Sequence, residues 1–144
     1  MHVSFALFAD AANLSQEGKL NILGVFDALQ VAQLPAIHAR ATLVVRIKGN
    51  AADVGAHDVS MRWVNPAGVE LWHSQGTLDF GALPDDVPEA DLPLIAVIDL
   101  PADLAGEYAM EISVDRQQAA RVPLLIRAMP SLPVMPPAPG GLVH

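Results

Sequence analysis

The sequence contains no cysteine and few charged residues. The absence of cysteine excludes disulfides, thiolate metal sites, iron–sulfur clusters and cysteine nucleophiles. Charged residues make up 17% of the 144 residues, below the roughly 25% of typical soluble domains, whereas hydrophobic residues make up 52%. Less polar surface is then available to cover the fold. Either the composition is simply rich in alanine and valine, or one face is covered by another subunit.

Basic residues are especially scarce. Eight Lys and Arg stand against 16 Asp and Glu, which gives a net charge of −8. Phosphate backbones and anionic membrane surfaces attract basic stripes, so we expect neither nucleic-acid nor membrane binding. No apolar run approaches the roughly 20 residues of a membrane-spanning helix. Residues 3–9 have no basic residue before them and end at Asp10, so we expect a buried strand, not a signal peptide, and a cytoplasmic location.

Short apolar stretches separated by turn residues run through most of the chain. Many alternate with period two, which is typical of half-buried strands. About eight such stretches with short turns predict one β-sandwich or barrel domain over residues 1–127, with helix under about a tenth of the chain. The expected strands are 3–9, 19–27, 40–48, 57–64, 69–80, 94–100, 107–114 and 120–127. Pro123 predicts that the last of them is an edge strand or turns that position outward.

Two aromatic residues favour an immunoglobulin-like antiparallel β-sandwich. Tyr108 begins the penultimate strand, where a tyrosine corner would place its buried hydroxyl against the backbone of residues 101–106. Counting back from that strand puts Trp63 on the strand that buries a tryptophan in such folds. We therefore predict an immunoglobulin-like antiparallel β-sandwich of about eight strands.

Asn65-Pro66-Ala67-Gly68 indicates a hairpin between strands 57–64 and 69–77. A three-residue loop, 66–68, would place Trp63 opposite Leu71 in the core. The same register would place Arg62 opposite Trp72 on the outer face, where the guanidinium can lie on the indole. A slip of one residue would turn Leu71 out and Trp72 in.

The strand 19–27 is apolar on both faces, with Leu23 and Val25 opposite Leu20, Ile22 and Phe26. Such a strand is either covered on both faces by its own domain or lies at an interface. Leu23 and Val25 are therefore candidate interface residues, and self-association, most simply as a dimer, is expected through the N-terminal strands or the C-terminal tail.

Residues 128–144 form a proline-rich tail. Pro130, Pro133, Pro136 and Pro139 recur every third residue, so they would form one ridge of a polyproline II helix. The tail is either a low-complexity extension or a strap laid on a partner. The predicted interaction surface therefore consists of Leu23, Val25, Trp72, Pro130, Pro133, Pro136 and Pro139.

The titratable residues predict no catalytic, cofactor or metal site. None of the five histidines has a metal-ligand spacing, although His57 and His73 fall on neighbouring expected strands. The expected loop 10–18, with Asp27, offers oxygen ligands without a known calcium-loop spacing, so it more simply bonds its own backbone. No nucleophile elbow or phosphate-binding glycine loop is present. We therefore expect no enzyme activity and no cofactor.

Two stretches carry a family resemblance, Phe-Ala-Asp-Ala-Ala-Asn-Leu-Ser-Gln-Glu-Gly-Lys-Leu-Asn-Ile-Leu-Gly-Val-Phe-Asp at 8–27 and Leu-Pro-Ala-Ile-His at 34–38, with later pieces at 106–108 and 114–115. They resemble a bacterial protein family known only as a domain of unknown function. The resemblance covers about residues 3–127 and excludes the tail. Asp115-Arg116 stands where the resemblance implies Asp-Gly, and the family brings no activity with it.

These observations predict a non-catalytic interaction or assembly module whose partner is a second copy or another protein. The alternative is a sandwich that binds a small ligand or a carbohydrate. An exposed aromatic platform would favour the alternative, and Trp72 is the candidate residue for it.

Overall fold

Residues 1–130 are described by the computed structural model, and they form nine β-strands and no α-helix. Alternation of apolar and polar residues accounts for the strands, because successive side chains of a strand point to opposite faces. Asn50 caps a 3-10 turn, η1 (Ala51–Asp53). The strands are β1 (His2–Leu14), β2 (Leu20–Phe26), β3 (Ala28–Val31), β4 (Ala36–Gly49), β5 (Gly55–Val64), β6 (Glu70–Phe80), β7 (Ala90–Ala102), β8 (Gly106–Val114) and β9 (Gln117–Ala128).

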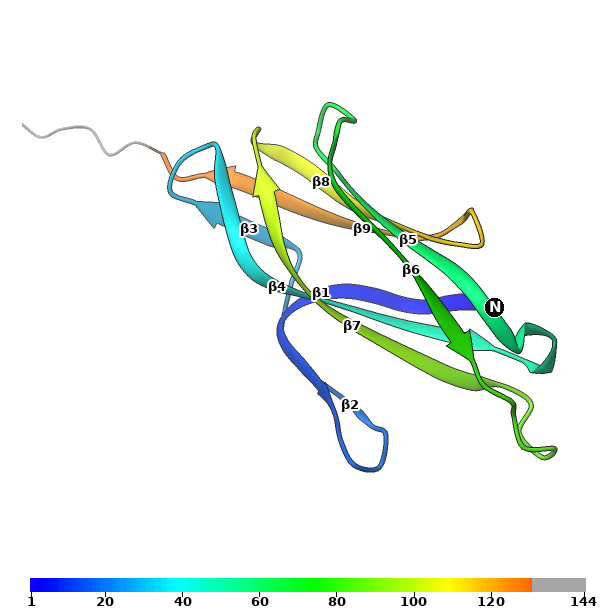
Figure 1. Cartoon of the computed structure of the whole chain (residues 1–144). Coiled ribbons are helices and arrows are strands. Elements are labelled where there is room, and N and C mark those ends of the chain that lie inside the picture. Colours follow the sequence, from blue (N-terminus) through cyan, green and yellow to red (C-terminus); the bar gives the residue numbers. More distant parts are fainter. Residues whose placement is uncertain (131–144) are drawn as a thin grey trace, which may run out of the picture.

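The strands form two sheets (Figure 1). Sheet A has the order β2-β1-β4-β7, and sheet B has the order β3-β9-β8-β5-β6. Among the described strands, β3 and β9 pair in parallel and the other neighbours are antiparallel. The prediction of an all-β fold is confirmed, with nine strands in place of about eight and one parallel pair in a sheet expected to be purely antiparallel.

The inner faces of both sheets share one hydrophobic core. Leu43, Val45 and Ile47 alternate along β4 and are fully buried, and they face buried residues of sheet B such as Trp63 and Met110. Burying one such side chain stabilises a fold by about 1.5–3 kcal/mol, so this shared core holds the two sheets together.

Tyr108 lies at the start of β8 with its side chain fully buried, as predicted. Its hydroxyl accepts hydrogen bonds from the backbone N–H groups of Asp103 and Leu104, both at 2.9 Å, and lies 2.7 Å from the carbonyl oxygen of Leu104. Burial raises the pKa of this hydroxyl. Its ring stacks on Trp63 at 5.1 Å between centroids, and the Trp63 indole donates to the carbonyl of Pro101 at 2.8 Å.

The β5–β6 hairpin has the predicted three-residue loop, but the predicted register is wrong. The Asn65 and Val69 backbones bond across the loop, and Gly68 takes the left-handed conformation at φ +81°. Val64 pairs with Glu70, yet Trp63 pairs with Trp72 and not with Leu71. Leu71 is thus the extra residue of a β-bulge, which shifts the rest of β6 by one position.

β9 is not an edge strand over its whole length, because β3 pairs with Leu125–Ala128. Pro123 lies before that paired segment and is exposed. The part of the prediction that turned this position outward is therefore confirmed.

Candidate functional site

The β1–β2 hairpin extends beyond the rest of sheet A. β1 pairs with β4 up to Ala9, whereas from Ala11 to Leu14 it pairs with β2 alone. Residues 10–26, called the arm here, therefore project from the body of the molecule (Figure 1). The loop expected over 10–18 is shorter than predicted, because Asp10 to Leu14 continue β1.

Short polar contacts close the tip of the arm. The Ser15 backbone N–H donates to the carbonyl of Lys19 at 2.8 Å, and the Ser15 hydroxyl accepts the Lys19 N–H at 3.0 Å. Farther along, the Asn21 amide donates to the Asn13 side chain at 3.0 Å. At Gly24, φ is +72° and the Asp10 carboxylate lies where a Cβ would stand. The polar residues of this stretch thus bond and pack within the arm itself.

The two faces of β2 meet different surroundings. Leu20 and Ile22 line a hollow with Phe5 and Pro93, and all four are partly buried. On the opposite face Leu23 is 72% exposed and Val25 is 60% exposed. The explanation that the 19–27 strand is covered on both faces by its own domain is therefore wrong, because β2 is an edge strand with one open apolar face.

Val25 belongs to a row of side chains that crosses all four strands of sheet A. Ala9 pairs with both Val25 and Thr42, and Thr42 pairs with Val97. Val97 is 56% exposed, so the row begins and ends in an exposed valine. Ala9 and Thr42, in the middle of the row, are 0% and 4% exposed, so buried side chains separate the exposed valine on the arm from the exposed valine on β7.

The two sheets have four edge strands, and three of them carry features that discourage pairing with another strand. β7 contains Pro93 and Pro101, which have no N–H to donate, together with Asp91 and Asp99. β6 carries polar exposed residues from His73 to Thr77, and β3 is only four residues long. β2, with the sequence Leu-Asn-Ile-Leu-Gly-Val-Phe, has neither proline nor a charged residue.

Trp72 does not lie on an open outer face as predicted. The bulge at Leu71 sets Trp72 opposite Trp63, and its half-buried side chain packs against the core. Arg62 lies opposite His73 and forms ion pairs with Glu70 at 3.5 Å and Glu111 at 3.6 Å. The expected guanidinium–indole contact is therefore replaced by carboxylate contacts, and Trp72 is only partly available as a platform for a sugar.

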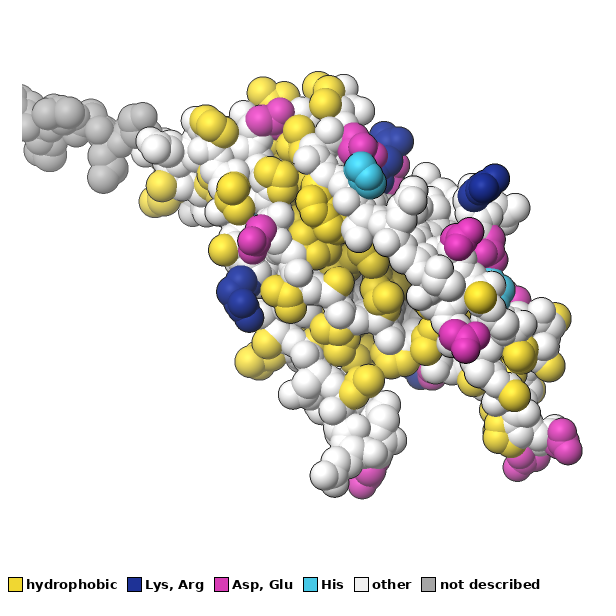
Figure 2. Space-filling model, in the orientation of Figure 1, with side chains coloured by type: hydrophobic (Ala, Val, Ile, Leu, Met, Phe, Trp, Pro, Cys, Tyr) yellow, Lys and Arg dark blue, Asp and Glu magenta, His cyan; other side chains and the backbone are white. Residues whose placement is uncertain are grey.

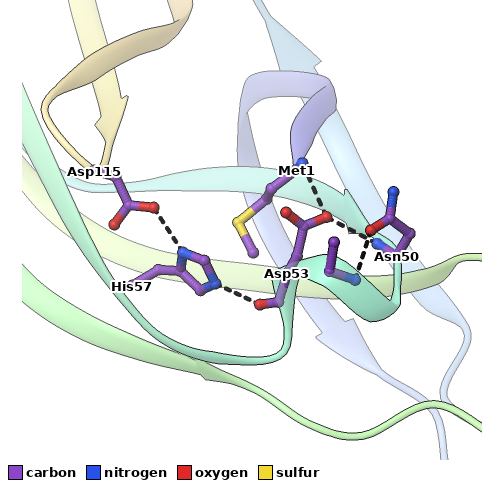
Figure 3. Close-up of polar contacts among 6 residues, drawn as sticks. Met1, Asn50, Asp53, His57 and Asp115 are labelled. Carbon is purple, nitrogen blue, oxygen red and sulfur yellow. Dashed lines mark hydrogen bonds and ion pairs between the residues drawn. The ribbon is translucent and has the colours of Figure 1, made fainter.

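A polar cluster around His57 joins three segments (Figure 3). His57 Nδ1 lies 2.7 Å from the Asp115 carboxylate, and Nε2 contacts the backbone carbonyl of Asp53. The Asp53 carboxylate lies 3.0 Å from the Met1 amino nitrogen and accepts the Asn50 N–H at 2.9 Å. Both oxygens that face the ring are acceptors, so the arrangement favours the doubly protonated imidazole, and the bond to Asp115 raises the pKa of His57.

Sequence reasoning does not find this cluster, because Met1 and Asp115 lie far in sequence from residues 50–57. Its one local signal is Asp115-Arg116, whose φ angles of +50° and +66° build the two-residue turn between β8 and β9. His73 lies elsewhere on the β5–β6 ladder, opposite Arg62, whereas His57 lies opposite Leu78, so these two histidines are not brought together.

A mainly apolar hollow of about 560 Å³ lies where β4 begins and β7 ends. Ile37 is 69% exposed there. Sequence reasoning passes over this hollow, and its only signal is the apolar Leu34–Ile37 segment in an expected connection. We call it the Pro35 hollow, and it is lined by Pro35, Ala36, Ile37, Leu71, Pro101, Ala102 and Asp103.

The remaining expectations concern the tail and bound ions. Pro130 is exposed at the end of the described chain, while Pro133, Pro136 and Pro139 lie outside the described residues. Within residues 1–130, no group of three or more histidine and acidic side chains is placed to hold a metal ion. The described part also has no helix of the length and hydrophobicity that crossing a membrane requires.

No protein of curated function matches this sequence. One family model matches residues 4–127, which include all of β2 to β8 and nearly all of β1 and β9. The resemblance noted for the opening motif is confirmed by this match, and the chain belongs to a family of unknown function, DUF6941.

Proposed function

We propose that this protein is a non-catalytic assembly module with an immunoglobulin-like fold, which joins a second copy of itself through β2. The observation that carries the proposal is the unprotected edge of β2, with Leu23 and Val25 exposed beside it. The scarcity of basic residues argues against nucleic acid and anionic membranes as partners, and the absence of cysteine suits a cytoplasmic protein.

The strand order supports the immunoglobulin-like part of the proposal. In such folds the C, F and G strands lie together in one sheet, and here β5, β8 and β9 are neighbours. β5 carries the buried Trp63, and β8 carries the tyrosine corner at Tyr108. On this reading β1, β4 and β7 correspond to A, B and E, and the arm strand β2 is an addition at the outer edge.

Two copies of β2 are complementary to each other. An antiparallel pairing around a two-fold axis at Gly24 places Leu23 opposite the partner's Val25, and Val25 opposite the partner's Leu23. These four aliphatic side chains would then lie side by side on one face of the joined sheet and partly cover one another. The backbone hydrogen bonds between the two edges add to this contact, so we expect a weak dimer.

The proposal that the module is non-catalytic rests on how its polar groups are engaged. His57 is held between two acceptors, and the Asp103 carboxylate accepts hydrogen bonds from Asn65 at 3.0 Å and contacts the Tyr108 hydroxyl at 3.0 Å. Burial raises the pKa of Asp103, but these hydrogen bonds outweigh burial and lower it overall. These hydrogen bonds hold the turns in place, which supports a structural role for both groups.

Sedimentation of the full chain at tens of micromolar tests the proposal. We expect the wild type to contain a species of twice the 15.2 kDa chain mass. Leu23→Lys with Val25→Lys should leave a single 15.2 kDa species, because two charges on each edge repel across the two-fold axis.

Val54→Lys is the matched control, since Val54 is 46% exposed but lies before β5, away from the arm. This variant should keep the dimer. A wild-type chain that sediments as a monomer throughout, or a dimer that survives both arm substitutions, would contradict the proposal.

A further inference from the structure

The Pro35 hollow is an apolar site that the proposed dimer leaves open. Six of its seven lining residues are aliphatic or proline, and the seventh, Asp103, already contacts Asn65 and Tyr108. The space-filling view in Figure 2 shows hydrophobic side chains gathered in a band on this face of the molecule, with charged side chains mainly around it. The hollow therefore suits an uncharged, apolar occupant.

The β-bulge in β6 contributes directly to the hollow. The ladder register changes at Leu71, and Leu71 is the residue of β6 that lines the hollow. Bulges commonly re-aim one side chain in this way. Ile37, opposite Pro101 in the β4–β7 ladder, is 69% exposed beside it. Two large aliphatic side chains from different sheets are thus presented together at one open site.

The described chain ends close to this site. Ala128 of β9 pairs with Val31 of β3, and the Met129 N–H donates to the Val31 carbonyl at 2.8 Å. Pro35 follows Val31 by four residues, which span at most about 14 Å. Figure 1 shows the end of β9 at the same end of the molecule as the start of β4 and the end of β7.

The segment that follows has both the length and the chemistry to fill the hollow. Residues 131–139, Ser-Leu-Pro-Val-Met-Pro-Pro-Ala-Pro, contain no charged side chain in a chain whose net charge is −8. In polyproline II conformation, nine residues would reach about 28 Å. We propose that residues 131–139 dock intramolecularly in the Pro35 hollow, with their proline ridge against Ile37 and Leu71. Short attachment to β9 makes this docking effectively unimolecular and so favours it over capture of a separate chain.

A spin label tests the docking in the full chain. Because the sequence has no cysteine, Ala138→Cys creates a single thiol that a nitroxide reagent labels uniquely. Methyl NMR should then show loss of signal intensity at Ile37 and Leu71, while Leu23 and Val25 on the arm keep their signals. Adding Ile37→Asp should restore the Leu71 signal, because a charge in the hollow opposes the apolar segment. Val97→Asp, on the exposed face of β7, should not restore it.

Two outcomes would overturn the proposal. One is an unchanged Leu71 intensity in the labelled chain, or a loss that persists equally in Ile37→Asp. The other is broadening of the Leu71 signal in a mixture of two kinds of chain, one carrying only the isotope label and the other only the nitroxide. Broadening in that mixture means that the segment docks on another copy. Neither outcome depends on the β2 dimer, which the arm substitutions test separately.

Discussion

At the residue scale, the tyrosine corner shows how one hydroxyl can hold a turn. The Tyr108 hydroxyl oxygen accepts hydrogen bonds from two backbone N–H groups, and the hydroxyl also contacts the carbonyl of Leu104. The ring stacks on Trp63 in the core. Tyr108→Phe should leave both N–H groups without this acceptor in a part-buried position. We expect a loss of about 1–3 kcal/mol in the free energy of unfolding, measured by urea denaturation. An unchanged midpoint would show that the hydroxyl contributes nothing.

Arg116 occupies a conformation that suits glycine better. Both turn residues have positive φ, and Arg116 stands at +66°. The left-handed conformation costs an L-residue about 1–2 kcal/mol, whereas glycine adopts it freely but loses more entropy on folding. Arg116→Gly should therefore raise the unfolding free energy by a few tenths to about 1 kcal/mol in the same assay. A destabilised variant would mean that the arginine side chain contributes more than its backbone strain costs.

At the element scale, His57 connects η1 and the β8–β9 turn to the start of β5. Because the pKa of His57 is raised in the folded state, its interactions stabilise the fold fully below the unfolded-state pKa of 6.5. This stabilisation is lost as pH rises through the folded-state pKa. The hydrogen bond from His57 lowers the pKa of Asp115, and the N–H of Asn50 lowers that of Asp53. The stabilisation from these two carboxylates is present above their unfolded-state pKa of 3.8 and is lost as pH falls through their lowered folded-state pKa values.

His57→Gln should therefore destabilise the protein most in mildly acidic solution and progressively less at alkaline pH. The measurement is the difference in unfolding free energy between wild type and variant across that range. Asp115→Asn should remove the same pH-dependent part of the unfolding free energy, because the Asp115 carboxylate is the group that favours the charged imidazolium of His57. A difference that stays constant with pH would rule out a charged His57 in the native state.

The strands themselves were largely predictable from the sequence, but their register was not. Alternation at 59–63 and 108–114 is enough to find β5 and β8, because side chains facing a core repeat every two residues. The bulge at Leu71 is invisible locally, since Leu71 and Trp72 are both apolar and either can face inward. β3 is missed because four residues form too short a pattern.

The candidate site could be predicted only in part. Leu23 and Val25 were identified from the apolar character of both faces of β2, but only the strand order shows which face is open. The Pro35 hollow needs residues from three strands and the bulge, so no local pattern indicates it. Asp10 and Asn13 look like loop residues, yet they lie in a projecting hairpin where polar side chains need not be buried.

At the scale of the whole molecule, net charge should modulate self-association. Each copy carries −8, so two copies repel one another at long range, while the proposed contact itself contains no charge. Raising salt from about 0.01 M to about 0.1 M shortens the Debye length from about 30 Å to about 10 Å. The dimer fraction measured by sedimentation should therefore increase with salt. A dimer that dissociates as salt is added would instead indicate ion pairs across the interface.

The parallel pairing of β3 with β9 has a consequence for when the fold can be completed. Ala28 lies beside Leu125, 97 positions later, and the carbonyl of Asp27 accepts the N–H of Leu125 at 3.0 Å. During synthesis, the arm hairpin has all its pairing partners within the first 26 residues. β3, which follows it directly, has to wait until its partner residues 125–128 have left the ribosome. Such distant pairing is slow to form, so a nascent chain would expose β2 well before sheet B is complete.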